Sequence, residues 1–288
     1  MKKIKCCYLC GSKYSIQVHG KVRDIPEIGI KKCENCSLVY LDTHDHLSDD
    51  YYHKEYDKDV FGQWSHQNYL SYSKIDDDRR IKQVLPYVSN KSYLDVGCGA
   101  GGVAIHVKKY CNQVSVVEPM KKWQKVLKDR GLEVFGDHSE LKGKKYDFIS
   151  MFHVLEHIAD PIGFLTEYKE NISEGGLMLI EVPSADDILL KLYESEAFAN
   201  FTYWSPHLYL FNPNTFSMVV EKSGLKIEAI QQLQRYPLSN HLKWLAKSEG
   251  GGHIDWSFID SPDLMSAYES QLSKMGMCDT LIAWVRKI

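Results

Sequence analysis

Four of the eight cysteines of this chain form two C-x-x-C pairs near its start. Cys7 pairs with Cys10, and Cys33 pairs with Cys36 after a spacer of twenty-two residues. Two such turns can bring four thiolates to the corners of a tetrahedron, which is the geometry of a closed structural zinc site. Cys6 is an alternative first ligand, and free or redox-active thiols are the alternative to a metal. We expect one Zn²⁺ that braces the fold and leaves the chemistry to other residues.

A second chemically informative stretch, YLDVGCGAGG, reads as a buried strand that runs into a glycine-rich turn. Gly97, Gly99 and Gly102 satisfy G-x-G-x-x-G, and Glu118 ends the next apolar stretch, where an acid that binds ribose is expected. NAD is therefore one interpretation. Asp95, inside the strand, disfavours a pyrophosphate because both are negative, but it can accept from an ammonium group. S-adenosylmethionine has an ammonium group and no phosphate.

With Gly101 as a further glycine, the turn reads D-x-G-x-G-x-G. On this motif the chain resembles the class I S-adenosylmethionine-dependent methyltransferases, over roughly residues 90–235. The resemblance implies that Asp95 and the backbone of the glycine turn hold the methionine end of the cofactor. It also implies that Glu118 accepts from both ribose hydroxyls.

The same resemblance assigns the other side of the cofactor site. Asp137, with His138 beside it, follows the short stretch LEVFGD and would meet the adenine amino group. His153 ends the apolar stretch YDFISMF, where the reaction centre of the family opens. The alternative for each glycine is a plain tight turn, and for Asp137 a helix N-cap.

The residues FHVLEH raise a different possibility, because His153, Glu156 and His157 match the inverted zinc-protease signature H-x-x-E-H. A protease would need both histidines on one helix face. His153 ends an apolar strand, so we expect the two rings not to share a helix. Many class I methyltransferases have a similar run that continues to Asp and Pro, as it does here at Asp160 and Pro161. His157 then has either a catalytic role or only hydrogen bonds to the backbone.

An aromatic segment farther on, FANFTYWSPHLYLFNPNTF, contains His207. Class I enzymes often insert elements that cover the substrate at this point, and aromatic walls suit a sugar or a ring. We expect His207 to be the general base that takes a proton from the substrate, with His157 as the second choice. The alternative is that His207 merely bonds the insertion to the core.

The elements that must position these residues follow from periodicity. From residue 92 onward, apolar runs of strand length alternate with helical patterns, which predicts an α/β fold with a parallel sheet and helices on both faces. Asp160 followed by Pro161 predicts a helix start, and Gly175 with Gly176 predicts a stop before the next strand. The resemblance implies a Rossmann-like, mostly parallel seven-stranded sheet.

We divide the chain into three parts. Residues 1–50 form a small zinc-ribbon-like module, residues 51–90 a helical linker or cap, and residues 91–288 the methyltransferase domain. Insertions that cover the substrate are expected near 197–214 and 235–276.

Composition limits the partners. The chain has 288 residues, 44% hydrophobic and 25% charged, which is ordinary for a globular protein. Its formal charge of −3 gives no global attraction to nucleic acid or to an anionic membrane. No apolar run approaches the length of a membrane span, and MKKIKCCYLCG lacks the apolar core of a signal peptide. We expect a cytoplasmic protein with a small-molecule substrate and no nucleic-acid or membrane partner.

A zinc module before a methyltransferase core resembles the sugar and antibiotic-pathway methyltransferases, including C-methyltransferases of nucleotide-linked sugars, and also the ribosomal RNA guanine methyltransferases. The sugar C-methyltransferases usually have a further C-terminal domain, which this chain is not expected to have, and the RNA enzymes need basic surface. We therefore expect methyl transfer to a hydroxyl of a sugar or a similar intermediate, as in polysaccharide biosynthesis. The reading from another class is a zinc-ribbon interaction protein that binds the cofactor without turnover.

Overall fold

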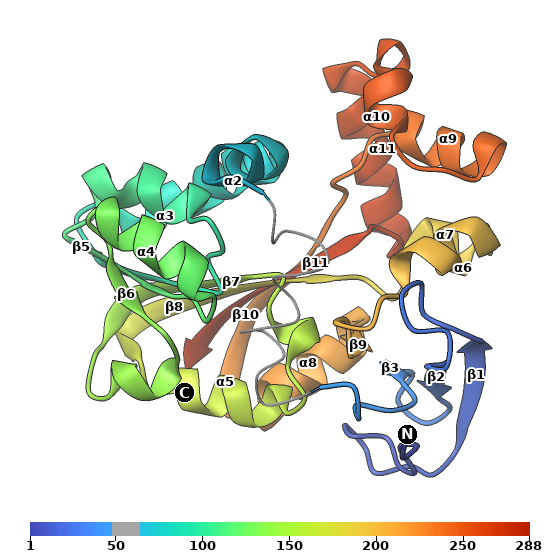
Figure 1. Cartoon of the computed structure of the whole chain (residues 1–288), viewed down its shortest axis with the longest axis horizontal. Coiled ribbons are helices and arrows are strands. Elements are labelled where there is room, and N and C mark those ends of the chain that lie inside the picture. The colour runs from blue at the N-terminus through green and yellow to red at the C-terminus, as the bar shows by residue number, and fades with distance from the viewer. Residues whose placement is uncertain (48–63) are drawn as a thin grey trace.

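The computed structural model describes residues 1–47 and 64–288. The boundary expected near residue 50 and the first part of the expected 51–90 linker lie outside the described residues. The chain forms a large central sheet with helices on both faces, and a smaller sheet lies beside it at the N-terminal end (Figure 1). Every helix in the described ranges is too short or too polar to cross a bilayer.

The large sheet has seven strands in the order β10-β11-β8-β7-β4-β5-β6. Neighbouring strands are parallel, except that β11 runs antiparallel to both of its neighbours. From β4 the chain moves outward through β5 to β6, and then returns to the other side of β4 for β7 and β8. The carboxyl end of β4 is therefore the point where the strand order reverses, which is where open α/β sheets bind ligands. The strands are β4 Ser92–Val96, β5 Gln113–Val117, β6 Glu133–Phe135, β7 Tyr146–Phe152, β8 Ile172–Pro183, β10 Leu225–Leu233 and β11 Thr280–Lys287.

Two hydrophobic cores lie on the two faces of this sheet. Helices α2 (His66–Val88), α3 (Gly102–Val107) and α4 (Lys121–Asp129) pack on one face, with Trp123 and Leu127 of α4 fully buried there. Helices α5 (Pro161–Lys169) and α8 (Pro213–Lys222) cover the other face. The central strands β4, β5 and β7 are buried over most of their length, since helices cover both faces, whereas the edge strand β10 alternates between apolar and polar residues.

The small sheet is antiparallel and has the order β1-β2-β3-β9. Strands β1 (Ser15–His19), β2 (Ile30–Cys33) and β3 (Val39–Leu41) come from the first fifty residues. Strand β9 (Tyr209–Leu210) comes from the aromatic segment that follows β8, and it pairs with β3. The N-terminal module is thus completed by a strand distant in sequence, and its core is continuous with that under α5 and α8.

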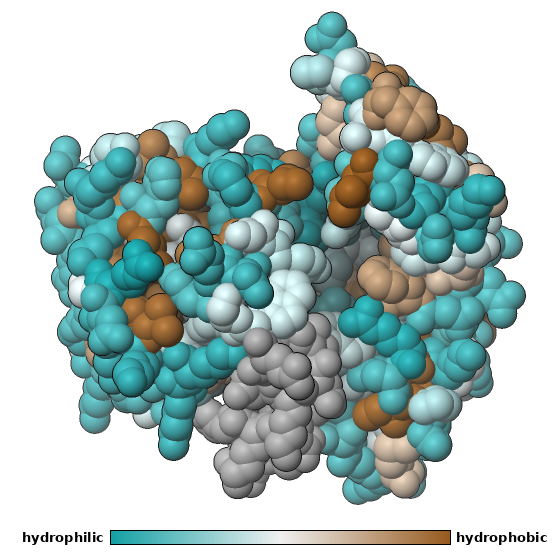
Figure 2. Space-filling model, turned by 45° about the horizontal axis from the view of Figure 1, so that its top comes forward, coloured by the Kyte–Doolittle hydropathy of each residue, from teal (hydrophilic) through white to brown (hydrophobic). Residues whose placement is uncertain are grey.

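The remaining helices follow β8 and β10. Helix α6 (Ile188–Lys191) precedes the aromatic segment, and α7 (Glu196–Thr202) includes its first residues. Residues 238–275 contain α9, α10 and α11. These last helices stand away from the sheet (Figure 1), and a hollow separates them from the part that carries α2 (Figure 2). Their bounds are α9 Leu238–Lys247, α10 Gly252–Asp255 and α11 Pro262–Met275, and short 3-10 turns occur at Lys108–Tyr110, His138–Leu141, Leu155–His157 and Ser257–Ile259.

The sequence predictions of fold class and of most elements are confirmed. Asp160 caps α5 by accepting from the Gly163 N–H at 3.0 Å, with Pro161 in the first turn. The stop predicted at Gly175 and Gly176 is wrong, because β8 already begins at Ile172 and runs through both glycines. The register between β7 and β8 shifts at this point, so the irregularity lies within the strand.

The glycine turn after β4 gives a test of how closely the fold is packed there. At Gly101, φ is 79°, and an added Cβ would lie 2.3 Å from Cδ2 of Leu127. At Gly175, φ is 69°, but a Cβ would meet nothing within 4 Å. A left-handed residue other than glycine costs about 1–2 kcal/mol, so Gly175→Ala should lower the melting temperature by about 2–6 °C. Gly101→Ala should lower it at least about twice as far, because α4 must also move. Equal losses in calorimetric melting would contradict the packing described here.

Candidate functional site

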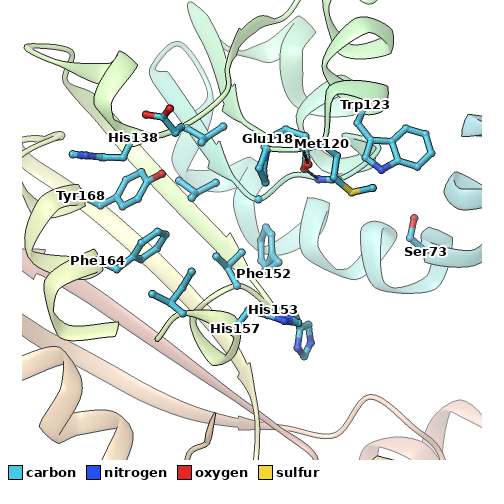
Figure 3. A pocket seen from close by; sticks show the side chains of 18 of the residues that line it. Ser73, Glu118, Met120, Trp123, His138, Phe152, His153, His157, Phe164 and Tyr168 are labelled. Atoms are coloured by element: carbon cyan, nitrogen blue, oxygen red, sulfur yellow. Dashed lines mark hydrogen bonds between the residues drawn. The ribbon is translucent and has the colours of Figure 1, made fainter. Parts of the chain in front are cut away.

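A cavity of about 770 Å³ opens at the carboxyl ends of β4, β5 and β7. The glycine turn, Glu118 and Asp137 line one end, and His153, His157 and His207 line the other. One face of α2 covers the cavity between them, with Tyr69, Ser73, Asp76 and Arg80 spaced as neighbouring turns of a helix. Figure 3 shows that side chains from both halves of the sheet point into the same space. The cavity has the place and size of a site for a nucleotide-like cofactor together with a second ligand.

The glycines of the turn have different roles. Gly97 has φ of 68°, and an added Cβ would lie 2.5 Å from Val154 Cγ2, while at Gly99 it would lie 3.1 Å from the Tyr69 hydroxyl. Gly97 and Gly99 line the cavity, so the absence of side chains lets a ligand approach the backbone. Gly101 faces α4, and Gly102 begins α3. Two glycines of the motif therefore line the cavity, and the other two serve the packing of the turn against its helices.

Glu118 follows β5 and lines the cavity although only 3% of it is exposed. Its Oε2 accepts from the Gly99 N–H at 2.7 Å, and its Oε1 accepts from the Met120 N–H at 2.8 Å. Burial raises the pKa of this carboxyl to about 7 in spite of these two hydrogen bonds. The backbone holds both oxygens in place at the position expected for a ribose contact.

Asp95 lies one layer deeper. It is 2% exposed, and its Oδ1 accepts from the Ser150 hydroxyl at 2.8 Å, which in turn contacts the Tyr93 hydroxyl at 2.7 Å. Burial raises its pKa to about 7. Within the described residues, the wall of the cavity includes Val96 and Gly97 but not the Asp95 side chain. The role of Asp95 at the methionine end of the cofactor stays a prediction.

Asp137 and His138 lie beyond β6 and both line the cavity. Asp137 caps the 3-10 turn by accepting from the Ser139 N–H at 2.7 Å, and the hydrogen bonds from Ser139 lower its pKa. His138 Nε2 lies 2.9 Å from Asn171 Oδ1, and its ring contacts Tyr168 edge-on at 4.5 Å. Asp137 thus caps the turn and also lines the cavity. His138 lies beside the aromatic side chains of Tyr168 and Phe164 (Figure 3).

His153 is the first of three histidines at the other end. It follows β7 in the left-handed region, with φ of 55°, and its Nδ1 lies 3.0 Å from Glu156 Oε1. Its Nε2 lies 3.3 Å from Glu181 Oε1 and 3.2 Å from Arg235 Nη1. Burial alone would lower its pKa, but the bonds to Glu156 and Glu181 raise it.

His157 and His207 lie against each other, with ring centroids 4.9 Å apart. His157 ends the 3-10 turn after β7, and His207 precedes β9. Burial lowers the pKa of both rings, that of His207 to about 3 with a further contribution from His157. Both are therefore neutral near pH 7. His153 and His157 do not share a helix, so the zinc-protease arrangement is absent, as the sequence predicted.

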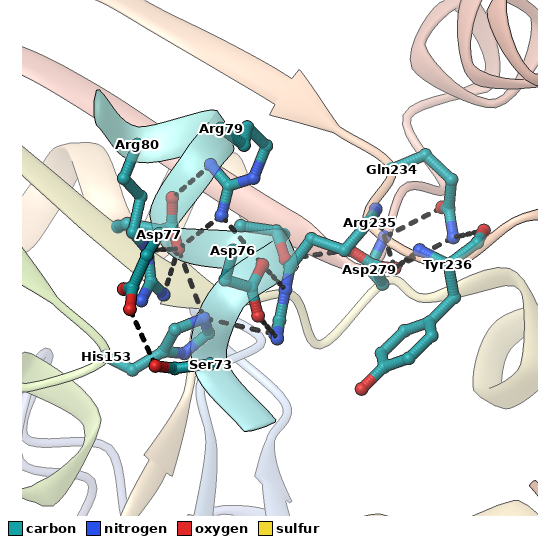
Figure 4. A network of polar contacts seen from close by, with 12 residues as sticks. Ser73, Asp76, Asp77, Arg79, Arg80, His153, Gln234, Arg235, Tyr236 and Asp279 are labelled. Atoms are coloured by element: carbon teal, nitrogen blue, oxygen red, sulfur yellow. Dashed lines mark hydrogen bonds and ion pairs between the residues drawn. The ribbon is translucent and has the colours of Figure 1, made fainter. Parts of the chain in front are cut away.

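Sequence reasoning missed the ionic network behind these histidines (Figure 4). The Glu181 carboxylate is 0% exposed, and it accepts from Arg79 at 2.7 Å and from Arg80 at 2.6 Å. Arg235 pairs with Asp76 of α2. The spacing of polar and aromatic residues along α2 was a usable signal for Asp76 and Arg80, but nothing local in the sequence marks Arg235 as their partner.

The four cysteines of the N-terminal module lie together. The Sγ atoms of Cys7 and Cys36 are 3.5 Å apart, as are those of Cys10 and Cys33, and all four lie within 4.8 Å of one another. A regular zinc–thiolate tetrahedron has sulfur atoms about 3.8 Å apart, so the donor set fits Zn²⁺. Each pair sits in a turn closed by a hydrogen bond to the first cysteine, Gly11 N–H to Cys7 and Ser37 N–H to Cys33. Cys6 is exposed and outside the cluster.

Comparisons with known proteins agree with this geometry. A family model described as a methyltransferase domain matches residues 66–230, more than half of the chain. Protein MJ1123 of Methanocaldococcus jannaschii, which is uncharacterized, is 27% identical over 150 residues, 51% of this chain and 66% of that protein. The ubiquinone biosynthesis O-methyltransferase of Hydrogenovibrio crunogenus is 21% identical over 175 residues, 54% of this chain and 73% of that enzyme. The chain thus spans only about two thirds of the length of these relatives.

A solved structure of an S-adenosylmethionine-dependent methyltransferase from Archaeoglobus fulgidus has a similar fold. It superposes with a TM-score of 0.53 and 18% identity, and the match covers 76% of this chain and 99% of that chain. The Rossmann-like fold expected from the sequence is therefore confirmed.

The geometry around the glycine turn predicts which cofactor binds. Carboxylates lie close to the glycine turn. Asp95 precedes the turn in β4, Glu118 accepts from the Gly99 N–H, and Asp77 lies against Gly102. They disfavour a pyrophosphate and tolerate a sulfonium and an ammonium group. We expect calorimetry to show binding of S-adenosylmethionine or its demethylated product and no binding of NAD. Glu118→Gln should weaken the binding at least about tenfold, because the variant loses a charge-assisted ribose contact. Tight NAD binding without sulfonium binding would overturn this assignment.

Proposed function

This chain belongs to the family of methyltransferase domains, and on that premise we propose that it transfers the methyl group of S-adenosylmethionine to a hydroxyl of a sugar or a related biosynthetic intermediate. The observation that carries the proposal is the single cavity with a cofactor end and a histidine-lined end. Membership of the family supports methyl transfer, and the cavity supports the class of acceptor.

At the cofactor end we propose the roles that the resemblance implies, and the position of these residues along the cavity supports them. Glu118 accepts from the ribose hydroxyls, Asp137 and His138 face the adenine, and the backbone at Gly97 and Gly99 adjoins the methionine end. Asp95 accepts from the ammonium group at this end, as the resemblance implies. When bound, S-adenosylmethionine would supply an electrophilic methyl group on its sulfonium sulfur. The chain contributes alignment of the two reactants and exclusion of water.

At the acceptor end we assign the proton acceptor to His207, with His157 as the second candidate. A sugar hydroxyl is a poor nucleophile at neutral pH, so a neutral imidazole within reach accelerates the step. Both rings line the cavity and are neutral near pH 7 because burial lowers their pKa. His153 is the poorer candidate, since Glu156 and Glu181 favour its charged form.

The sugar-like acceptor rests on the walls of this end. Trp204 and Tyr72 line it together with polar groups of Asp76 and Arg235. Flat aromatic faces flanked by hydrogen-bonding groups suit a ring that has hydroxyls. The relative from Hydrogenovibrio crunogenus is an O-methyltransferase, which supports oxygen as the accepting atom. A role in polysaccharide biosynthesis is part of this proposal.

We further propose that Cys7, Cys10, Cys33 and Cys36 hold one structural Zn²⁺. A closed four-thiolate site has no open position, so its contribution is to the fold. The module contacts the catalytic half through several groups. The Tyr8 hydroxyl donates to Asp160, Asp24 accepts from the N–H and the hydroxyl of Ser205, and β3 pairs with β9, which begins two residues after His207. We place the protein in the cytoplasm, where thiols stay reduced and available to the metal.

His207→Ala tests the role of the base. The variant should lose turnover by at least about a hundredfold on the true acceptor, because an imidazole base contributes about 10²- to 10⁴-fold. Cofactor affinity and melting temperature should stay unchanged, since no described residue hydrogen-bonds to the His207 ring. Normal turnover, or a joint collapse of cofactor affinity and stability, would show that the residue is structural and would pass the role to His157.

Elemental analysis tests the metal. The wild type should contain one zinc per chain, and Cys33→Ser should lose it and melt at a lower temperature, because a structural site contributes to folding. Cys6→Ser is the matched control and should keep the full metal content. Full zinc in Cys33→Ser, or loss in Cys6→Ser, would mean that the ligands are assigned wrongly.

A further inference from the structure

The carboxylate of Glu156 lies against the histidines of the acceptor end. Glu156 is 0% exposed. Its Oε1 lies 3.0 Å from His153 Nδ1 and 3.9 Å from His157 Nε2. Its Oε2 is fully buried and has no hydrogen-bond partner in the described ranges.

An unpaired oxygen on a buried carboxylate is unfavourable, and proteins rarely keep one without a reason. Burial favours the neutral acid, but the hydrogen bond to His153 and the charges of the three histidines lower the pKa of Glu156 to about 2. Glu156 is thus a fixed negative charge whose second oxygen is available for a positive partner.

The neighbouring imidazoles are held close to this carboxylate. A carboxylate oxygen of Glu156, an imidazole nitrogen of His157 and an imidazole nitrogen of His207 all lie within 4.8 Å of one another. His157 also bonds to the backbone of Pro206, and the Leu208 N–H donates to the Glu156 carbonyl at 2.9 Å. The segment that carries His207 is therefore tied to the turn that carries Glu156 and His157.

The base assigned above needs such a partner. A ring with a pKa of about 3 is neutral at pH 7, but it binds a proton weakly. A catalytic base works best when its pKa is near the working pH, so a group that stabilises the imidazolium form increases the rate. Of the groups around the two rings, Glu156 raises the pKa of both.

We propose that Glu156 is the positioning residue of the acceptor base, and that its carboxylate stabilises the imidazolium formed on His207 or His157 during methyl transfer. This inference rests on the proposed function. In the step, the acceptor O–H bond breaks and its proton passes to an imidazole nitrogen. The oxygen forms a bond to the methyl carbon, and the electrons of the C–S bond stay on sulfur. Glu156 remains ionised throughout and takes no proton.

Other charged groups face this cluster, and they do not supply the same effect. Arg235 and His153 are cationic or favour a cation, and Arg23 of the N-terminal module lowers the pKa of His207. Glu181 of β8 already accepts from two arginines of α2. Asp76 is paired with Arg235. Unlike Glu181 and Asp76, Glu156 is not paired with an arginine, so its negative charge acts on the His157 and His207 rings.

Glu156→Gln keeps the size of the side chain and removes its charge. Without the carboxylate the imidazole pKa falls, so the acid limb of the kcat profile should move to lower pH by at least about half a unit, and kcat at its plateau should fall at least about tenfold. KM for S-adenosylmethionine should not change. Glu156→Asp retains the charge and should keep most of the wild-type profile. Glu174→Gln, on the exposed surface at the far end of β8, is the control and should match the wild type.

A second measurement needs no acceptor. NMR titration of the histidine rings should show the midpoint of His157 lower by about half a unit or more in Glu156→Gln, and unchanged in Glu174→Gln. If this shift occurs but no acceptor is methylated, the proposed function fails and the coupling stands. Unchanged profiles and titrations in a folded Glu156→Gln overturn the proposal. Loss of the melting transition in both Glu156 variants also overturns it, because the carboxylate would then be part of the structural frame.

Discussion

The buried carboxylate of Glu181 is the interaction on which the acceptor end depends. A carboxylate with no exposed surface is tolerated only where cations and hydrogen bonds replace its water. Arg79 and Arg80 provide these from α2, and His153 provides a further contact from the end of β7. Since Asp76 on the same helix binds Arg235, the network also fixes the segment after β10 (Figure 4). Removing one member would leave an unpaired buried charge, which is strongly destabilising.

This arrangement explains why one cavity can have two chemically different ends. At the cofactor end, backbone N–H groups hold Glu118, and glycines expose the main chain. At the acceptor end, side chains hold one another, because His153, Glu156 and Arg235 come from separate elements. The first end needs only the correct local turn. The second requires the complete tertiary fold, and it is therefore the end that can differ between proteins that share the fold.

The same distinction decides what the sequence could predict. Most strands, the cap at Asp160 and the place of Glu118 after β5 follow from local periodicity and turn chemistry, and the structure has them as predicted. The start of β8 differs, because the strand runs through Gly175 and Gly176. The burial of Asp95 follows from its place in an apolar strand, but its partner Ser150, in β7, could not be read from the sequence. Arg235, Asp76 and Glu181 could not be connected, since no local signal relates residues so far apart. The two residues of β9 were too few to show a strand pattern, and only their pairing with β3 reveals them.

The distant origin of β9 has a consequence for biosynthesis. Strand β3 ends at Leu41, whereas its partner begins at Tyr209. A ribosome that adds about 5–20 residues per second needs roughly ten to thirty seconds to synthesise the chain between them. During that interval the nascent β3 has an open hydrogen-bonding edge, which invites pairing with other chains. Nascent chains on neighbouring ribosomes are therefore the ones most prone to pair wrongly. The need for a chaperone should be greatest before residue 210 leaves the ribosome.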